Sequence, residues 1–423
     1  MGIDFTSRRE REPGLLIDYS ETTGDLDVER APGPRDLEIT DIQTTMVDGN
    51  YDWTLVRIYT DAGIVGTGEA YWGSGVPPII ESAKPYLLGE NPLDIDRLYT
   101  HLIQRFSGEG SLAGSVVTAV SGLEIALHDL AGKVLDVPAY QLLGGKYRDH
   151  VRVYCDTHAG SHGAESDTAE YRDEHSPEAY AQAAKGVVDD GFDALKFDLD
   201  VPSEYDKDRM NRHLRDPELR HKVDIVEAAT EAVDDDIDVA FDCHWSWTGD
   251  SASRLAEAIE PYDVFWLEDP VPPENHDVQR TVTRSTSTTV AAGENVYRTH
   301  GFRRLIEEEA VDVIQPDLPK MGGMRETMKI ANKAETYYIP FALHNVSSPI
   351  GTMAGAHTAC ACPNFLALEY HARAVDWWAD LVNEPIIEDG YIQVPERPGI
   401  GLTLDLDVVE DRMVEGETLF DES

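Results

Sequence analysis

The chain has 423 residues, 41% of them hydrophobic, which is enough to form two domains with large buried cores. Asp and Glu number 80 against 35 Lys and Arg, so the formal net charge is -45. Binding to nucleic-acid phosphates or to an anionic membrane surface requires a basic face, so both partners are disfavoured. The acidic residues are spread along the whole sequence, which is typical of a halophilic protein whose surface charge is screened by salt.

The sequence shows no sign of secretion or membrane insertion. Residues 1–12 are charged and lack the apolar segment of a signal peptide, and no apolar run reaches the roughly 18 residues that a membrane span needs. The cysteines contain no CxxC pair and predict no disulfide framework; they are Cys155, Cys243, Cys360 and Cys362. We therefore expect a cytoplasmic protein.

Residues 1–36 are mostly polar and contain a Pro/Gly stretch, and we interpret them as an extension that contacts a neighbouring subunit of a homo-oligomer. Three strands are expected next, at 38–47, 53–60 and 64–70. Residues 76–137 are then expected to be helical, including one helix over 115–135 with Ser115 as its N-cap. Residues 37–150 therefore predict an α+β domain.

After residue 150 the pattern changes to short apolar runs, each followed by a helical stretch. The runs are 151–154, 194–198, 239–244, 264–268, 290–294, 311–317, 339–344 and 365–369. Alternation of strand and helix predicts a parallel sheet, and eight such units can close into a (β/α)8 barrel of the α/β class. The barrel domain is expected to cover residues 151–375.

Six successive runs, from 239–244 to 365–369, carry an acidic residue or a histidine at or near their C-terminal end. The six are Asp242, Glu268, Glu294, Asp317, His344 and Glu369. Consecutive members are 26, 26, 23, 27 and 25 residues apart, which is about one strand-helix unit of a barrel. Side chains at the C-terminal ends of barrel strands converge on one mouth, where the active sites of barrel enzymes lie.

Three of the strand-end residues, Asp242, Glu268 and Glu294, bring carboxylates to this mouth. Carboxylates held together in a partly dry site repel each other unless they take up protons or hold a cation. Ligands that are all oxygen suit a hard divalent ion, and Mg²⁺ leaves room for substrate oxygens. The sequence therefore predicts a Mg²⁺ site.

Two histidines are candidates for proton transfer. Asp317 ends the strand before His344, and neighbouring strands lie about 4.8 Å apart, so the carboxylate can orient the imidazole and raise its basicity. His244 stands two residues after Asp242, and residues at this spacing in a strand share a face. We therefore expect both imidazoles to point into the mouth.

The motifs WLEDP, AAGEN, QPD, KMGG, HN and LEYH together resemble the mandelate racemase branch of the enolase superfamily, over residues 38 to about 400. The resemblance implies an N-terminal domain that caps the barrel and a C-terminal segment, 376–423, that returns to the cap. It implies that the three carboxylates hold Mg²⁺, that Asp317 and His344 act as a general acid/base, and that Glu369 hydrogen-bonds the enediolate oxygen. Cap loops near the substrate would contribute Tyr71 and Trp72.

The second barrel strand distinguishes two activities of this branch. Racemases of the branch end that strand in Lys-x-Lys, whereas Lys196 is here followed by Asp198, which disfavours a two-base racemisation. The D-x-H motif at His244 resembles that of galactonate dehydratase, in which one histidine removes the alpha proton and another protonates the departing 3-hydroxyl. We favour His344 as the base and His244 as the acid, and the reverse order stays open.

Further residues are assigned to the substrate. Lys196 is expected to neutralise the substrate carboxylate or assist the enediolate, with a salt bridge to Asp198 or Asp242 as the alternative. Asp198 is expected to bind a substrate hydroxyl, and His158 to touch a polyol chain. The polar segment 160–176 is long for a loop and is interpreted as a lid.

These assignments predict a Mg²⁺-dependent dehydratase of an aldonic acid such as gluconate, galactonate or xylonate. It would remove the alpha proton, stabilise the enediolate and lose the 3-hydroxyl, giving a 2-keto-3-deoxy acid. The first alternative is a racemase, epimerase or cycloisomerase that uses the same site. The second is a member that binds metal and sugar acid but has lost activity.

Overall fold

The computed structural model describes residues 37–73, 75–159 and 171–421. The chain divides into two units, residues 1–36 and residues 37–423, and the extension predicted for the first unit lies outside the described residues. Most of the predicted lid, 160–170, lies outside them as well. No helix in the described part of the chain is long and apolar enough to cross a membrane.

The second unit begins with a three-stranded antiparallel sheet of consecutive strands, as predicted. These are β1 (Ile39–Asp48), β2 (Asp52–Thr60) and β3 (Val65–Ala70). Two glycines let β3 lie directly on the helix α3 (Ser115–Leu135), because a Cβ at Gly66 or Gly68 would come within 2.3–2.4 Å of backbone oxygens of that helix. The sheet and its helices bury their own hydrophobic cluster.

Two further helices, α1 (Val76–Ala83) and α2 (Ile95–Arg105), complete this N-terminal domain. The prediction that Ser115 caps α3 is wrong, because Ser115 is the first helical residue and Gly114 occupies the N-cap without a side-chain hydrogen bond. Gly114 has a φ of 81°, in the left-handed region that glycine adopts without strain. The backbone of this glycine, and not a serine hydroxyl, therefore sets the start of the helix.

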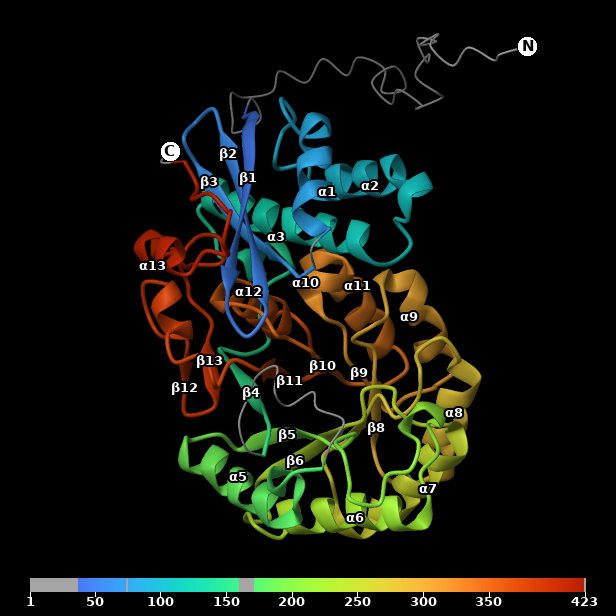
Figure 1. Cartoon of the computed structure of the whole chain (residues 1–423). Helices are drawn as coiled ribbons and strands as arrows, with labels where there is room; N and C mark the ends of the chain where they lie inside the picture. Colours follow the sequence, from blue (N-terminus) through green and yellow to red (C-terminus); the bar gives the residue numbers. More distant parts are fainter. Residues whose placement is uncertain (1–36, 74, 160–170, 422–423) are drawn as a thin grey trace, which may run out of the picture. The chain divides into compact units, whose positions relative to one another are not determined.

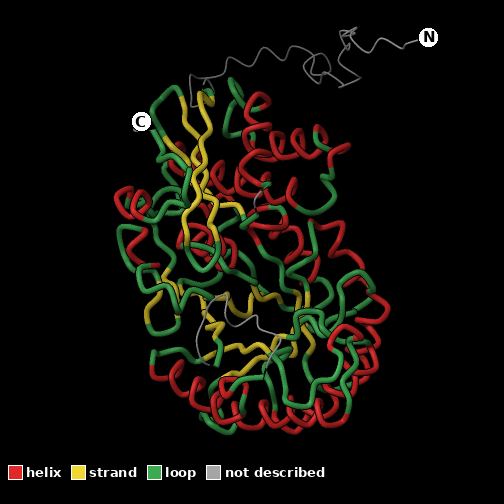
Figure 2. The backbone as a smooth tube through the Cα atoms, in the orientation of Figure 1, coloured by secondary structure: helices red, strands yellow, loops and turns green. Residues whose placement is uncertain are grey.

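Eight parallel strands form the closed barrel that the sequence predicts (Figures 1 and 2). They are β4 (His150–Thr157), β5 (Ala194–Asp198), β6 (Asp238–Asp242), β7 (Leu267–Glu268), β8 (Val290–Ala292), β9 (Val313–Ile314), β10 (Phe341–Leu343) and β11 (Phe365–Tyr370). Each strand pairs with the next, and β11 pairs with β4 to close the barrel. Several strands are shorter than the apolar runs that predicted them, so polar residues expected inside strands follow them in loops.

The helices after the strands pack around the outside of the barrel (Figure 1). They are α5 (Pro177–Asp189), α6 (Asp216–Thr230), α7 (Gly249–Ile259), α8 (His276–Ser285), α9 (Arg298–Glu307), α10 (Leu318–Met321), α11 (Gly323–Glu335) and α12 (Pro349–Cys360), whereas the short helix α4 (Ala139–Leu142) precedes β4. Short 3₁₀ turns lie at Lys84–Tyr86, Ser107–Glu109, Asp173–His175, Arg209–Asn211, Glu260–Tyr262 and Trp378–Leu381. Inside the barrel, Tyr154 and Trp266 meet edge to face at 5.1 Å among small alanines.

The C-terminal part of the chain contacts both the barrel and the N-terminal domain. Strands β12 (Ile387–Glu388) and β13 (Tyr391–Gln393) add to the start of β4 in antiparallel fashion. After the helix α13 (Leu406–Asp411), Val414 donates a backbone hydrogen bond of 3.0 Å to Met46 of β1. The chain thus returns to the first sheet, and the exact division at residues 150 and 375 stays a prediction.

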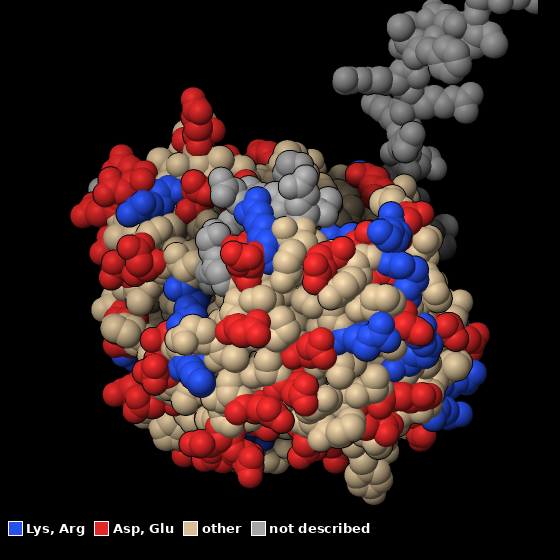
Figure 3. Space-filling model, turned by 60° about the horizontal axis from the view of Figure 1, so that its bottom comes forward, with Lys and Arg blue, Asp and Glu red and all other residues tan. Residues whose placement is uncertain are grey.

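The surface carries the acidic excess in a dispersed form. Figure 3 shows one face on which Asp and Glu side chains are scattered between smaller groups of Lys and Arg. The four cysteines are free and buried, in agreement with the absence of a predicted disulfide framework. A dispersed negative charge favours solvation of the whole face.

Candidate active site

The three predicted metal-ligand carboxylates meet at the C-terminal end of the barrel. Asp242 and Glu268 are the last residues of β6 and β7 and are direct register partners. Glu294 lies two residues beyond β8, after Gly293, so it is carried by the loop and not by the strand. One carboxylate oxygen from each residue lies within 4.8 Å of the others, and all three residues are buried. This set of oxygen donors fits a divalent cation.

Lys196 is the positive charge at the centre of this acidic cluster. Its Nζ lies 2.8 Å from Glu268 Oε1, 3.2 Å from Asp242 Oδ2, 2.8 Å from Glu369 Oε1 and 3.3 Å from Asp156 Oδ2. Burial acts to lower the pKa of Lys196, but the carboxylates of Glu268 and Glu369 outweigh it and raise the pKa well above its ordinary value. The ammonium group is therefore held charged and tied to four acids, including the predicted partner Asp242.

The cluster perturbs its own carboxylates in opposite directions. Burial raises the pKa of Glu268 well above its ordinary value despite the opposing charge of Lys196. Burial also acts to raise the pKa of Asp242, but His244 and Lys196 outweigh it and hold that pKa at about 2. A site in which ionised and protonation-prone carboxylates stand side by side is suited to an additional positive charge.

Asp317 and His344 form the predicted pair. The two residues face each other across an isolated parallel bridge, and Asp317 Oδ2 is 2.7 Å from Nδ1 of the imidazole. The other oxygen of Asp317 accepts the backbone N–H of Lys320 at 2.9 Å, so the carboxylate is fixed at the start of α10. The ring is almost completely buried, and its Nε2 is 2.7 Å from Glu294 Oε2.

The carboxylates around His344 control its protonation. Burial acts to lower the pKa of His344, but Glu294 and Glu369 outweigh it and raise the pKa well above its ordinary value. Glu369 is fully buried in β11, where its Oε2 accepts hydrogen bonds from the Asn345 backbone at 2.8 Å and the Tyr154 hydroxyl at 3.2 Å. Glu369 is therefore held rigidly between His344 and the ammonium group described above.

His244 reaches the site by a different route from the predicted one. The strand β6 ends at Asp242, and His244 has a φ of 40°, so the argument that both residues share one face of a strand is wrong. The turn nevertheless places Nε2 of His244 3.7 Å from Asp242 Oδ2. Its Nδ1 lies 3.1 Å from Asp200 Oδ1. The left-handed turn, and not strand periodicity, brings this imidazole next to the metal-ligand carboxylates.

Asp198 and His158 lie beside each other at the C-terminal ends of the neighbouring strands β5 and β4. Asp198 ends β5, and its Oδ2 is 3.3 Å from Nδ1 of His158. Together with Asp156 they form a second group whose ligand atoms all lie within 4.8 Å of one another. His371, from the LEYH motif, joins this group: its Nδ1 is 2.9 Å from Nδ2 of Asn50, and burial lowers its pKa to about 3.

The N-terminal domain supplies aromatic residues at the mouth. Tyr71 follows β3, and its ring centroid is 6.4 Å from that of His344. Trp72 stacks on Tyr51 at 5.2 Å and is 45% exposed, so it lies at the rim and not beside the carboxylates. The ring of Tyr51 is in turn 5.8 Å from that of His371. Both predicted cap residues are therefore near the site, at different depths.

Several residues of the site were not predicted. Glu268 Oε2 accepts hydrogen bonds from Trp266 Nε1 at 2.8 Å and from Gln315 Nε2 at 2.5 Å. Both donors stand two residues before an acid that the sequence predicts at a strand end, in the WLEDP and QPD motifs. Because residues two apart in a strand share a face, this spacing could have predicted that both side chains point into the barrel mouth. Asp156, the last residue but one of β4 and the register partner of Lys196, was missed as well.

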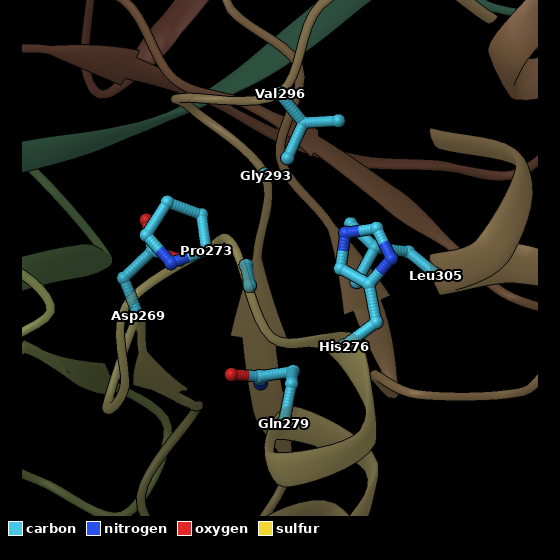
Figure 4. A pocket seen from close by; sticks show the side chains of 8 residues that line it. Asp269, Pro273, His276, Gln279, Gly293, Val296 and Leu305 are labelled. Atoms are coloured by element: carbon cyan, nitrogen blue, oxygen red, sulfur yellow. The ribbon is translucent and has the colours of Figure 1, made fainter. Parts of the chain in front are cut away.

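A small cavity lies beside the loops that carry the metal-ligand carboxylates (Figure 4). It has a volume of about 10 Å³ and is lined by Asp269, His276, Gln279 and Gly293 together with apolar side chains. Oδ2 of Asp269, Nδ1 of His276 and Nε2 of Gln279 are buried there without a protein partner among the described residues. The space fits about one water molecule.

Known protein families and solved structures match most of this chain. Residues 34–144 match the N-terminal domain of the mandelate racemase / muconate lactonizing enzyme family, and residues 178–408 match the enolase C-terminal domain-like family. A mandelate racemase/muconate lactonizing enzyme-like protein from Rubrobacter xylanophilus superimposes with a TM-score of 0.87 and 41% identity, covering 91% of this chain and 100% of that one. The chain belongs to the enolase superfamily, in its mandelate racemase/muconate lactonizing enzyme branch.

Two relatives with assigned activities narrow the comparison within this branch. A D-xylonate dehydratase of Haloferax volcanii is 65% identical over 409 residues, which are 96% of this chain and 96% of that protein. A D-gluconate dehydratase of Thermoproteus tenax is 32% identical over 362 residues, covering 84% of this chain and 69% of that protein. Within the superfamily, the chain is therefore similar to sugar-acid dehydratases.

Proposed function

We propose that this protein is a Mg²⁺-dependent dehydratase of an aldonic acid, with D-xylonate as its substrate. The observation that carries the proposal is the pair of imidazoles beside the carboxylates that fit a divalent cation. Nε2 of His344 lies 2.7 Å from Glu294, and Nε2 of His244 lies 3.7 Å from Asp242. Dehydration needs a base at C2 and an acid at the C3 oxygen, and these two groups match that requirement.

The first step is removal of the C2 proton. This proton is very weakly acidic, because its loss places a second negative charge on the carboxylate. When bound at Asp242, Glu268 and Glu294, Mg²⁺ supplies Lewis-acid stabilisation of that charge. Asp317 occupies Nδ1 of His344, so Nε2 is the atom that accepts the proton.

The second step is loss of the 3-hydroxyl. His244 donates a proton to the departing oxygen, water leaves, and the resulting enol tautomerises to the 2-keto-3-deoxy acid. Lys196 and Glu369 lie 2.8 Å apart and are placed to hold the oxygens of the substrate carboxylate and the enediolate. Asp198 is proposed to accept a hydrogen bond from a substrate hydroxyl.

The choice of substrate rests on the similarity to known dehydratases and on the group formed by Asp156, His158 and Asp198. D-xylonate is favoured over gluconate and galactonate because the D-xylonate dehydratase relative is much more similar than the D-gluconate dehydratase relative. His158 lies against Asp198 and is proposed to contact the hydroxyls far from the carboxylate. Tyr71 and Trp72 would close over them from the N-terminal domain.

A racemase or epimerase on the same site is disfavoured by the environment of Lys196. Nζ of Lys196 lies within 3.3 Å of four carboxylates, so this ammonium group is engaged by the protein and is not available as a second base. Asp198 stands where racemases of the branch carry their second lysine. The arrangement therefore supports elimination by an acid and a base and not racemisation by two bases.

The experiment is a ¹H NMR time course with D-xylonate, D-gluconate and D-galactonate in D₂O, with Mg²⁺ at high salt. We expect loss of the C2 proton, formation of the 2-keto-3-deoxy acid, fastest turnover of D-xylonate, and inhibition by a chelator that added Mg²⁺ reverses. Deuterium exchange at C2 without a keto acid would favour the racemase alternative. Binding without any reaction across the three acids would favour the inactive, sugar-acid-binding alternative.

A homo-oligomer and a cytoplasmic, halophilic setting are part of the same proposal. The acidic surface and the family membership support them. Sedimentation velocity at high salt, where charge repulsion is screened, measures the first directly. A monomer under these conditions would contradict it.

A further inference from the structure

Asp200 lies two residues beyond the end of β5 and faces the imidazole of His244. Its Oδ1 is 3.1 Å from Nδ1 of the ring, and its Oδ2 accepts a hydrogen bond of 3.2 Å from Oγ of Ser246. Asp198 is 3.8 Å from the same ring nitrogen, beyond hydrogen-bond reach. Among the residues that the structure describes, Asp200 is therefore the carboxylate that holds Nδ1 of His244.

This pair repeats the arrangement of Asp317 and His344 on the other side of the site. In both pairs the carboxylate meets Nδ1 and leaves Nε2 on the side of a metal-ligand carboxylate. The Nε2 atoms are 2.7 Å from Glu294 in one pair and 3.7 Å from Asp242 in the other. A carboxylate on Nδ1 fixes the tautomer and the orientation of the ring, and it leaves Nε2 for proton transfer.

His244 has a fixed backbone, whose N–H donates to Asp242 Oδ1 at 2.9 Å, and a partly exposed ring, so a partner on Nδ1 can set the orientation of the imidazole. His244 lies beyond the end of β6 in a left-handed turn, and its side chain is 37% exposed. The segment that carries Asp200 is anchored through its backbone as well. Leu199 donates a backbone hydrogen bond of 2.6 Å to Asp242, and the Arg209 guanidinium donates one of 2.5 Å to the carbonyl of Asp200. Both backbones are thus held, and the contact between the carboxylate and Nδ1 sets the orientation of the ring.

We propose that Asp200 is a positioning residue that presents Nε2 of His244 to the 3-hydroxyl of the sugar acid. The inference rests on the proposed dehydration and deepens it. In that step the C3–O bond breaks, the proton of Nε2 joins the departing oxygen to form water, and the electron pair of the enediolate forms the C2=C3 double bond. Asp200 touches no reacting atom and acts through the orientation of His244 alone.

The test compares Asp200→Ala with the wild type in the D₂O assay. Because C2 deprotonation is assigned to His344, we expect the variant to keep exchanging the C2 hydrogen while its kcat for dehydration falls by about 10–100-fold. The ratio of exchange to dehydration then rises at least about tenfold, whereas KM changes by less than about threefold. Asp200→Asn recovers part of kcat, because its amide oxygen still accepts from Nδ1–H.

The matched control is Asp208→Ala on the same loop. Asp208 accepts a loop hydrogen bond of 3.0 Å from the Met210 backbone, so the control disturbs the loop without altering the pair. Asp200→Ala behaving like Asp208→Ala would overturn the inference, and so would equal losses of exchange and dehydration. If Asp200→Ala does not fold, the ratio of exchange to dehydration in Asp200→Asn decides by the same criterion. Failure of the wild type to dehydrate any aldonate would instead refute the proposed function, independently of the variants.

Discussion

The two sides of the barrel mouth differ in how deeply they bury their imidazoles. On the side of β9 to β11, the side chains of Asp317, His344 and Glu369 are 0%, 7% and 0% exposed. On the side of β5 and β6, Asp200 and His244 are 23% and 37% exposed. Both sides direct Nε2 toward the same cluster of carboxylates, at Glu294 on one side and at Asp242 on the other, but the burial of the two rings differs. The dry side suits the harder step, since charge interactions there are less screened by water.

The difference originates in the contacts with the N-terminal domain. Beyond His344, the loop is held by Trp53, whose indole N–H donates to the Val346 carbonyl at 3.0 Å. It is also held by Glu69, which accepts backbone hydrogen bonds from Ser348 at 3.0 Å and Gly351 at 2.9 Å. The segment after β5 is held mainly by its own loop and by β6. One side of the mouth, the two-domain side, is therefore fixed by buried hydrogen bonds from the N-terminal domain, whereas the segment after β5 is fixed mainly by the barrel.

Replacement of each histidine is expected to give the largest change in reaction rate, and it tests the different roles of the two sides. His344→Ala removes the base of the dry side, so we expect both C2 exchange and dehydration to fall by about 10³–10⁴-fold. His244→Ala should abolish dehydration to a similar extent and retain exchange. NMR in D₂O measures both rates, and Mn²⁺ binding serves as the control for an intact site. Retained exchange in His344→Ala would show that the assignment of the base is reversed.

Lys196 connects the two sides, and its removal tests how the shared carboxylates are compensated. In Lys196→Met, four buried acids lose their cation, so we expect the free energy of unfolding without divalent ions to fall by about 3–5 kcal/mol. Added Mg²⁺ should recover much of this loss by binding the folded state. Urea unfolding at high salt measures both. Lys185→Met, at an exposed lysine of α5, is the control, and a loss no larger than in this control would contradict the account.

Glu69 allows the contact between the two domains to be tested through the pH dependence of the free energy of unfolding. Burial raises its pKa from 4.5 to about 7. Between these values the folded state binds more protons than the unfolded state, so this group makes stability fall as pH rises. The free energy of unfolding of the wild type minus that of Glu69→Gln should therefore fall by about 3 kcal/mol from about pH 4 to about pH 8.

Urea titrations at constant high salt measure the pH dependence of that difference. Glu81→Gln, at an exposed position of α1, provides the reference for changes unrelated to burial. A difference between wild type and Glu69→Gln that stays constant across the pH range would show that Glu69 is not the buried, titrating contact between the domains.

Replacement of Trp72, at the rim of the barrel mouth, is expected to give the smallest effect, a change in KM. Its stacking on Tyr51 would be lost in Trp72→Ala, and such aromatic pairs contribute about 0.5–1.5 kcal/mol. We expect KM for D-xylonate to rise by roughly 2–10-fold and kcat to change by less than about twofold. Steady-state kinetics measure both, with the exposed Tyr338→Ala as control. An unchanged KM would remove Trp72 from the substrate contacts.

The barrel could be predicted from the sequence because each of its strands is a buried apolar run, and each run is followed by a helix. The place of Asp242 and Glu268 could be predicted for the same reason, since they end such runs. His244 shows the limit of this reasoning. The apolar run in the sequence continues past Asp242, but the strand β6 ends there and His244 lies in a left-handed turn. Asp200 was missed because it follows a strand in a loop, where sequence carries no period.

Interactions between distant segments set a second limit. The four acids around Lys196 come from four different strands, so their convergence depends on closure of the barrel and not on any local pattern. The start of α3 illustrates the same limit on a small scale, since a left-handed glycine took the position expected for a serine cap. Strand-end residues and the Asp317–His344 pair are thus predictable from the sequence, whereas contacts that depend on loops or on closure of the barrel are not.

The most direct test of the account is a titration with Mn²⁺, followed by electron paramagnetic resonance, at high salt that screens the acidic surface. We predict one ion per chain in the wild type, displaced by Mg²⁺, and a loss of affinity of at least about 100-fold in each of Asp242→Asn, Glu268→Gln and Glu294→Gln. Equal stoichiometry and affinity in the wild type and these three variants would contradict a metal site at the three carboxylates, and with it the proposed chemistry.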